Sequence, residues 1–224
     1  MRLTLVRHGE TDGQSSIRYY GRTDVPLSAL GRTQMERVRR ALTGQRFAAV
    51  YASTLCRAVE AATIVCRGSA VRRVAGFDEI NFGAWEGLTV EEIRARDPEV
   101  YAHWAVRDGD FRYPAGESTR AFRRRVGRTL RAVLADAPPG DLLFVVHKGI
   151  IRCVLTELLQ LNDSERAALV ADLASIHVIS RDNGRWRAEA LNRVDHLRLR
   201  PAELSRGGQR PSRPTATSMS GRRL

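Results

Sequence analysis

The stretch L-V-R-H-G-E-T, residues 5–11, decides the fold and indicates where the chemistry of this chain lies. Leu3, Leu5 and Val6 form an apolar run that predicts a buried strand, and the run ends on an arginine, a histidine and a glycine. Side chains at the carboxyl end of a strand in an open α/β sheet face the crevice in which ligands bind. Gly9 is expected to let the backbone turn directly after the histidine.

Arg7 and His8, at the end of this strand, are residue types that suit phosphoryl transfer. Arg7 carries a planar, permanently charged guanidinium that matches phosphate oxygens. The imidazole of His8 is neutral near pH 7, and it is therefore nucleophilic. A tripeptide of this kind is also compatible with a core histidine beside a solvated arginine. The rest of the chain decides between these two interpretations.

Two further transitions from strand to helix supply the same residue types. A second strand is expected over 47–52, and S-T-L-C-R-A then places Arg57 at the start of a helical pattern. The apolar run 142–146 ends on His147 and passes through Gly149 into another helix. Between them, F-D-E-I-N-F-G-A-W-E-G offers Glu79 and Glu86. Two histidines, two arginines and a carboxylate at sheet edges form a set that chance seldom provides.

These motifs make the chain resemble the histidine phosphatase superfamily, which is also described as phosphoglycerate mutase-like. The family order continues in Y-G-R-T-D-V-P-L-S-A-L-G (20–31), P-A-G-E-S (114–118) and N-R-V-D-H-L (192–197). Alternating strands and helices already predict an α/β layered fold. The resemblance implies a three-layer α/β/α sandwich around a mostly parallel sheet, with one catalytic domain over residues 1–200.

The resemblance also implies a role for each residue of the set. His8 would attack phosphorus in line and form a phosphohistidine, so that one difficult displacement becomes two easier ones. Arg7, Arg57 and His147 would surround the phosphoryl oxygens and stabilise their charge in the transition state. Glu79 would protonate the departing alkoxide and then help to deprotonate the water that hydrolyses the phosphoenzyme. Because the arginines supply positive charge, neither a metal nor a cofactor is expected.

Four further residues are predicted to bind substrate: Gln14, Gly21, Arg22 and Lys148. Gln14 and Lys148 depart from the family pattern, which commonly has asparagine and glycine at these positions. Arg22 is equally compatible with substrate contact and with exposure to solvent. The ammonium of Lys148 would add a cation beside the phosphate or project into solvent. Glu86 is the alternative to Glu79 as the acid, although a structural role is expected for it.

The region between the acid and the second histidine bears on the type of reaction. Mutases of this family resemble one another in a long insertion there, whereas the segment between Glu79 and the P-A-G-E-S motif is short in this chain. The chain is therefore expected to be a phosphomonoesterase that acts on a small phosphorylated metabolite. It resembles alpha-ribazole phosphatases and broad-specificity phosphatases, and a phosphoglycerate mutase is the alternative.

The length and composition fit one globular domain. The chain has 224 residues, 43% of them hydrophobic, which suffices for one substantial core. It contains no apolar stretch of the ~20 residues that span a bilayer and no secretory signal pattern, so a cytoplasmic location is expected. Cys56, Cys66 and Cys153 lack C-x-x-C spacing, which argues against a disulfide framework and a zinc site. Cys56 is expected to be a plain buried thiol.

The formal net charge of +12 raises an alternative of another class, a nucleic-acid-binding protein. Nearly all of the positive charge is arginine, with Lys148 as the sole lysine, and no interleaved aromatic platform for bases is evident. A solvated basic surface that attracts anionic substrates is the favoured interpretation. Residues 201–224 are rich in Ser, Gly, Pro and Arg, and they are expected to form a disordered basic tail.

The apolar periodicity predicts the remaining elements. Helices are expected over 31–42, 58–65, 118–135 and 150–161. Strands are expected over 174–180 and 185–191, and an Asp-Asn-Gly turn would join them into a hairpin.

Overall fold

A computed structural model describes residues 1–106 and 110–198 of the chain, so the predicted tail at 201–224 and its boundary lie outside the described residues. Six strands form one sheet in the order β3-β2-β4-β1-β5-β6. The strands are β1 (Arg2–Arg7), β2 (Ala49–Ala52), β3 (Val71–Arg73), β4 (Leu142–Val146), β5 (Ile176–Asp182) and β6 (Arg185–Arg193). Three of the five strand pairings are parallel, and the two that involve β5 are antiparallel.

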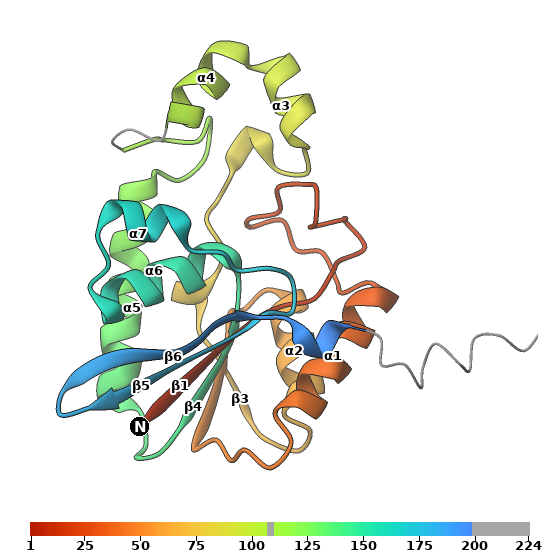
Figure 1. Ribbon diagram of the computed structural model, residues 1–224. Helices are drawn as coiled ribbons and strands as arrows, with labels where there is room; N and C mark the ends of the chain where they lie inside the picture. The colour runs from red at the N-terminus through yellow and green to blue at the C-terminus, as the bar shows by residue number, and fades with distance from the viewer. Residues whose placement is uncertain (107–109, 199–224) are drawn as a thin grey trace, which may run out of the picture.

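The helices lie on both faces of this sheet and above one of its edges (Figure 1). They are α1 (Ala29–Ala41), α2 (Cys56–Val65), α3 (Val90–Arg96), α4 (Pro98–Val106), α5 (Thr119–Asp136), α6 (Lys148–Leu159) and α7 (Asp163–Ala168). Three short 3-10 turns complete the described chain: η1 (Ala75–Phe77), η2 (Gly83–Trp85) and η3 (Asp195–Leu197). In residues 1–106 and 110–198, none of the helices combines the length and apolar character needed to cross a bilayer.

Alternating side chains along β4 divide the core into two halves. Leu142, Phe144 and Val146 pack with apolar residues of α5 and α6, whereas Leu143 and Val145 pack with those of α1 and α2. All five are fully buried because helices cover both faces of the sheet, and this explains the unbroken apolar run in the sequence. The predicted three-layer α/β/α sandwich around a mostly parallel sheet is therefore confirmed.

The pairing of β1 with β4 brings two motifs to the same edge of the sheet. Arg7 lies opposite Val146 in the parallel register, so His8 and His147 follow at adjacent strand ends. The backbone N–H of His8 extends the pairing by donating to the carbonyl of Val146 at 3.0 Å. The backbone register thus places the two histidines together, as their positions after buried strands predict.

The ends of several elements differ from the predicted ones. The second strand begins at Ala49, which is later than predicted. The helices that carry Arg57 and follow His147 begin at Cys56 and Lys148, which is earlier than predicted. Thr89 and Asn162 begin α3 and α7 in capping boxes. Sequence analysis missed both helices, although a Glu follows each cap residue at the diagnostic spacing.

Gly9 has a different role from the predicted one. Its φ is not positive, so the position does not require the conformational freedom of glycine. Instead, a Cβ at Gly9 would lie 2.6 Å from the carbonyl oxygen of Gly31, and a Cβ at Gly31 would lie 1.9 Å from that of Glu10. The two glycines let the segment after His8 cross the start of α1 at close range, and the prediction of a turn-forming glycine was wrong.

Candidate active site

His8 is held with one ring nitrogen available for reaction. Nδ1 lies 2.7 Å from the carbonyl oxygen of Gly9, which can only accept, so Nδ1 carries the proton and Nε2 keeps its lone pair. Burial lowers the pKa of His8 well below its ordinary value, and the positive charges of Arg57 and Arg7 lower it further. The imidazole is therefore neutral at pH 7, as a nucleophile must be.

His147 faces His8 from the end of β4. The two ring centroids lie 5.1 Å apart, and His147 Nε2 is 2.6 Å from the hydroxyl oxygen of Ser53. Burial lowers the pKa of His147 well below its ordinary value, and Arg57 adds to this effect. Its Nδ1 is buried and has no hydrogen-bond partner among the described residues.

Arg57 is a fully buried cation beside the histidines. Its guanidinium donates to the carbonyl oxygens of Gly21 at 2.6 Å and Thr23 at 2.9 Å. The carboxylate of Glu86 holds this loop because it accepts from the backbone N–H groups of residues 21–23 at 2.9–3.2 Å. Glu86 thus has the structural contacts expected of it, and Gly21 orients Arg57 through its carbonyl group.

Glu79 is placed by the helix that follows His147. Its carboxylate accepts from the N–H of Gly149, in the first turn of α6, and from that of Ile80, both at 2.9 Å. Burial raises the pKa of Glu79, although the two N–H donors and the nearby arginines oppose the rise. A Cβ at position 149 would lie 2.3 Å from the Glu79 carboxylate, so a glycine is needed here. A carboxyl group with a raised pKa can donate a proton.

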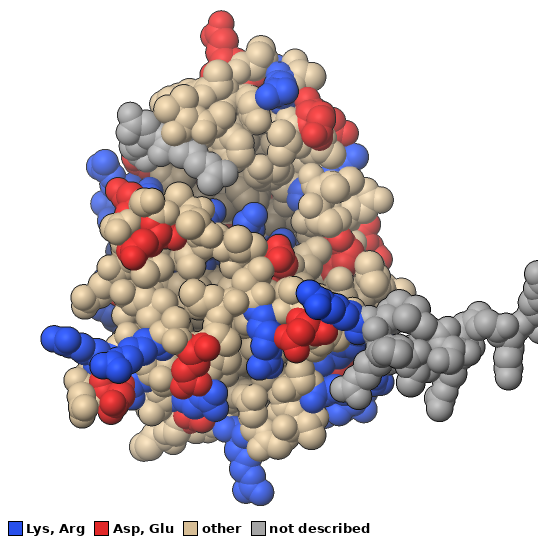
Figure 2. Space-filling model, in the orientation of Figure 1, with Lys and Arg blue, Asp and Glu red and all other residues tan. Residues whose placement is uncertain are grey.

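A cavity of about 600 Å³ opens beside this cluster, and Arg7, His8, Glu79 and Lys148 line it. His147 and Arg57 are buried behind them and are not among its described lining residues. Figure 2 shows the molecule hollowed below the α3–α4 segment. The structure thus brings together His8, His147, Arg7, Arg57 and Glu79, the five residues predicted to be catalytic. Of the four residues predicted to bind substrate, Lys148 alone is among the described residues that line this cavity.

Gln14, Gly21 and Arg22, the other three residues, make backbone contacts or lie at the surface. Gln14 has a φ of 61°, and its carbonyl oxygen accepts from two N–H groups of the following turn at 3.0 Å. Asparagine tolerates this conformation better than glutamine. The Arg22 side chain is 56% exposed and lies 3.9 Å from Asp78. Gln14, Gly21 and Arg22 are therefore not among the described residues that line the cavity.

One wall of the cavity is aromatic, and the sequence did not predict that these aromatic residues line a cavity. Tyr19 packs edge-on against Phe82 at 5.1 Å and against Trp104 of α4 at 6.1 Å between ring centroids. The indole N–H of Trp104 donates to the hydroxyl oxygen of Tyr113 at 3.1 Å. Such a wall offers flat apolar surface to the part of a substrate that does not react.

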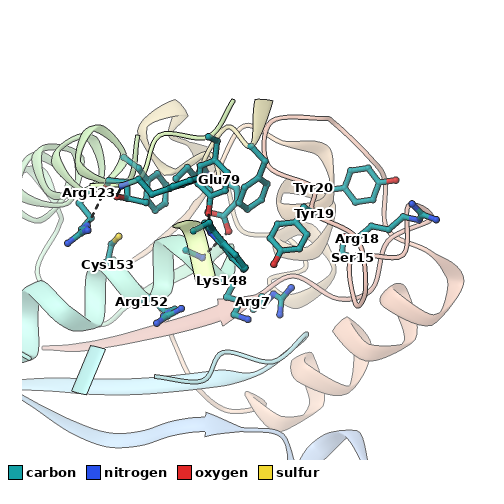
Figure 3. Close-up of a pocket in the computed structure, with 18 of the residues that line it drawn as sticks. Arg7, Ser15, Arg18, Tyr19, Tyr20, Glu79, Arg123, Lys148, Arg152 and Cys153 are labelled. Atoms are coloured by element: carbon teal, nitrogen blue, oxygen red, sulfur yellow. Dashed lines mark hydrogen bonds between the residues drawn. The ribbon is translucent and has the colours of Figure 1, made fainter. Parts of the chain in front are cut away.

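The opposite wall is basic. Arg123 of α5, Arg152 of α6 and Arg166 of α7 line the cavity around Cys153. In Figure 3, Arg123, Arg152 and Cys153 lie on one side of Lys148, and Tyr19 lies on the other. Burial raises the pKa of the Cys153 thiol to about 12, while the charges of the three arginines act in the opposite direction.

Helical spacing was the signal that could have found Arg152 of this wall. Lys148, Arg152 and Thr156 are four residues apart and share one face of α6, which lines the cavity. Cys56, by contrast, is partly exposed, so the prediction of a plain buried thiol at this position was wrong.

Known proteins are similar to this chain over most of its length. The family model described as "Histidine phosphatase superfamily (branch 1)" matches residues 3–194. A bifunctional protein of Mycobacterium tuberculosis is 34% identical over 180 residues, which are 79% of this chain and 49% of the relative. The chain therefore spans about half the length of that relative.

Two other similar proteins are matched over most of their length. The adenosylcobalamin/alpha-ribazole phosphatase of Salmonella typhimurium is 34% identical over 162 residues, 71% of this chain and 80% of the relative. The structure of a mycobacterial glucosyl-3-phosphoglycerate phosphatase has a TM-score of 0.74 and 30% identity, and the match covers 85% of this chain and 98% of the other. The resemblance that the motifs indicate is confirmed: this chain belongs to the histidine phosphatase superfamily, branch 1.

Proposed function

We propose that the protein is a phosphomonoesterase that works through a phosphohistidine on His8. One observation carries the proposal. Arg7 Nε at the end of β1, His147 Nδ1 directly after β4 and Arg57 Nε in the first turn of α2 are buried and have no hydrogen-bond partner among the described residues. Buried polar atoms without partners are costly, and a phosphoryl group offers the acceptor oxygens that would satisfy the two guanidinium groups.

The proposed reaction has two displacements at phosphorus. In the first, the lone pair of His8 Nε2 forms the N–P bond while the P–O bond to the alcohol breaks, and Glu79 gives its proton to the leaving oxygen. In the second, the Glu79 carboxylate takes a proton from a water whose oxygen forms the new P–O bond, and the N–P bond breaks. Arg7 and Arg57 stabilise the charge on the phosphoryl oxygens in both transition states.

The proposed substrate carries a second anionic group. Lys148 and the three arginines around Cys153 line the same cavity as His8 and the aromatic wall. One similar structure is described as a glucosyl-3-phosphoglycerate phosphatase, and a phosphoglycerate unit has a carboxylate besides its phosphate. We therefore propose a small phosphate ester whose body packs on the aromatic wall and whose second anion meets the basic wall.

The choice between hydrolysis and transfer tests the reaction type. With a phosphoglycerate as substrate, release of inorganic phosphate is expected to exceed formation of the isomeric phosphoglycerate. The reason is that the short segment after Glu79 gives little cover to exclude water during the lifetime of the phosphoenzyme. A phosphate assay run in parallel with a coupled assay for the isomer measures both products. Dominant formation of the isomer would favour a phosphoglycerate mutase instead.

A substitution at Lys148 tests the substrate class. Lys148→Gly is expected to lower kcat/KM for doubly anionic substrates by about threefold to fivefold, as for the loss of an exposed ion pair of about 0.6–1 kcal/mol. Turnover of a simple aryl phosphate should change little. Lys148→Arg should restore the preference, and Arg124→Met, an exposed charge loss on α5, should leave it unchanged. Equal losses on both substrate classes would mean that the lysine only faces solvent.

A further inference from the structure

A second cavity of about 450 Å³ lies away from the proposed active site, between α1 and the end of β6. Its described lining residues are Arg37, Arg40, Ala41, Arg193, Asp195, His196 and Arg198. Four arginines thus face one cavity, and Asp195 is the sole acidic residue among those described in its lining. This cavity shares no described lining residue with the cavity of the proposed active site.

The cavity wall contains hydrogen-bonding groups that the described chain leaves unused. Arg193 Nε lies 3.6 Å from a carboxylate oxygen of Asp195, which is within ion-pair range but too far for a hydrogen bond. Arg193 Nε and His196 Nδ1 are both buried and have no hydrogen-bond partner among the described residues. Buried polar atoms without partners are uncommon in native proteins, and a ligand with both acceptor and donor atoms would satisfy them.

The ring of His196 has a defined orientation. Its Nε2 lies 2.9 Å from the carbonyl oxygen of Ala174, so Nε2 carries the proton and the neutral ring presents Nδ1 as an acceptor. Burial lowers the pKa of His196, and Arg193 and Arg37 lower it further, against the effects of Ala174 and Asp195. The wall therefore combines fixed positive charge and N–H donors with one acceptor nitrogen.

We propose that this second cavity is a binding site for a phosphate group. A phosphate offers several acceptor oxygens to converging guanidinium groups, and in its protonated forms it also offers one O–H donor to an imidazole nitrogen. The phosphate could belong to a small molecule or to a nucleic acid. The described lining contains no Phe, Tyr or Trp on which bases could stack, so the cavity fits a small phosphate.

The site lies two hydrogen bonds from the nucleophile. His196 donates to the carbonyl oxygen of Ala174, and the N–H of Ala174 donates to the carbonyl oxygen of His8 at 3.1 Å. Ala174 is fully buried and has a φ of 56°, which is a strained conformation for alanine. A ligand in the second cavity would therefore contact His196, which is hydrogen-bonded to the residue that supports the backbone of His8.

The test is a count of phosphate ions bound to the full chain. Inorganic phosphate is titrated by calorimetry into the wild type, into an Arg40→Met/Arg198→Met variant and into an Arg185→Met/Arg187→Met control. Both double variants remove the same charge from exposed arginines, and the control positions lie at the other end of β6. The wild type and the control are expected to bind two phosphates per chain, one in each cavity. The cavity variant is expected to retain one and to bind the other about tenfold more weakly or worse.

The comparison of the two variants decides the proposal without reference to turnover. Equal phosphate binding by the cavity variant and the control would overturn it, whether or not the protein hydrolyses phosphate esters. A parallel titration with a single-stranded oligonucleotide separates the two sources of phosphate. Loss of oligonucleotide binding in the cavity variant, with phosphate binding unchanged, would refute the small-molecule site and assign the arginines to nucleic acid.

Discussion

Replacement of His8 by alanine is expected to lower phosphomonoester hydrolysis by at least about three orders of magnitude, because loss of a covalent nucleophile removes the whole two-step route. The fold should survive. The hydrogen bond from the His8 side chain to the carbonyl oxygen of Gly9 is local, and the backbone pairing of β1 with β4 does not depend on it. Steady-state turnover of p-nitrophenyl phosphate and a thermal melt measure the two effects.

The same prediction has a chemical signature. Rapid quench of the wild type with a phosphate ester should leave phosphate on His8 that is labile to acid and stable to base. His177→Gln is the matched control, because it changes another fully buried histidine, which hydrogen-bonds to Ser175 and Asn192 and does not line the cavity. It should keep its turnover. More than a trace of activity in His8→Ala would show that the proposed mechanism is wrong.

The second large effect is expected for Glu79→Gln, and its size should depend on the leaving group. For an alkyl phosphate, kcat/KM should fall by about 10²–10⁴, the usual contribution of general acid catalysis. For p-nitrophenyl phosphate the first step should be much less affected, because nitrophenolate leaves without a proton. Glutamine keeps one oxygen that can accept from the N–H of Gly149, but its amide nitrogen cannot accept from the N–H of Ile80, so a thermal melt of the variant should accompany the kinetics.

The pH dependence follows from the direction of the pKa shift at Glu79. Burial raises this pKa, so the protonated acid persists to higher pH than in an ordinary glutamate, and hydrolysis of alkyl phosphates should fall as the pH rises through that value. Glu79→Gln should lose this limb of the profile. Glu86→Gln is the control, since it loosens the loop that orients Arg57 and should affect both leaving groups alike. Equal losses for both leaving groups in Glu79→Gln would exclude it as the acid.

The sequence predicts the chemical centre better than its surroundings. His8 and His147 each follow an apolar run that both faces of the sheet bury, and parallel pairing of such runs must bring their carboxyl ends together. The aromatic wall follows no such rule. Trp104 lies on α4, a helix in which no residue is fully buried, and its contact with Tyr19 joins segments far apart in the chain. Local periodicity does not encode a contact of this kind.

Gly9 illustrates the same limit at one residue. The motif R-H-G correctly indicates a glycine-dependent strand end, but the reason for the glycine is the approach of Gly31, which only the tertiary structure shows. The basic wall is also visible only in the tertiary structure, because Arg123, Arg152 and Arg166 meet around Cys153 from three different helices.

The α3–α4 segment has a consequence for how enzymes of this design can diversify. It stands above the sheet edge and contributes Trp104 to the aromatic wall, whereas the proposed nucleophile, its arginines and the proposed acid all lie outside it. One hydrogen bond of 2.9 Å, from the indole of Trp85 to Asp97, helps to anchor it to the core. Insertions, deletions and recombination in this segment can therefore remodel substrate choice while the phosphoryl-transfer machinery is inherited unchanged.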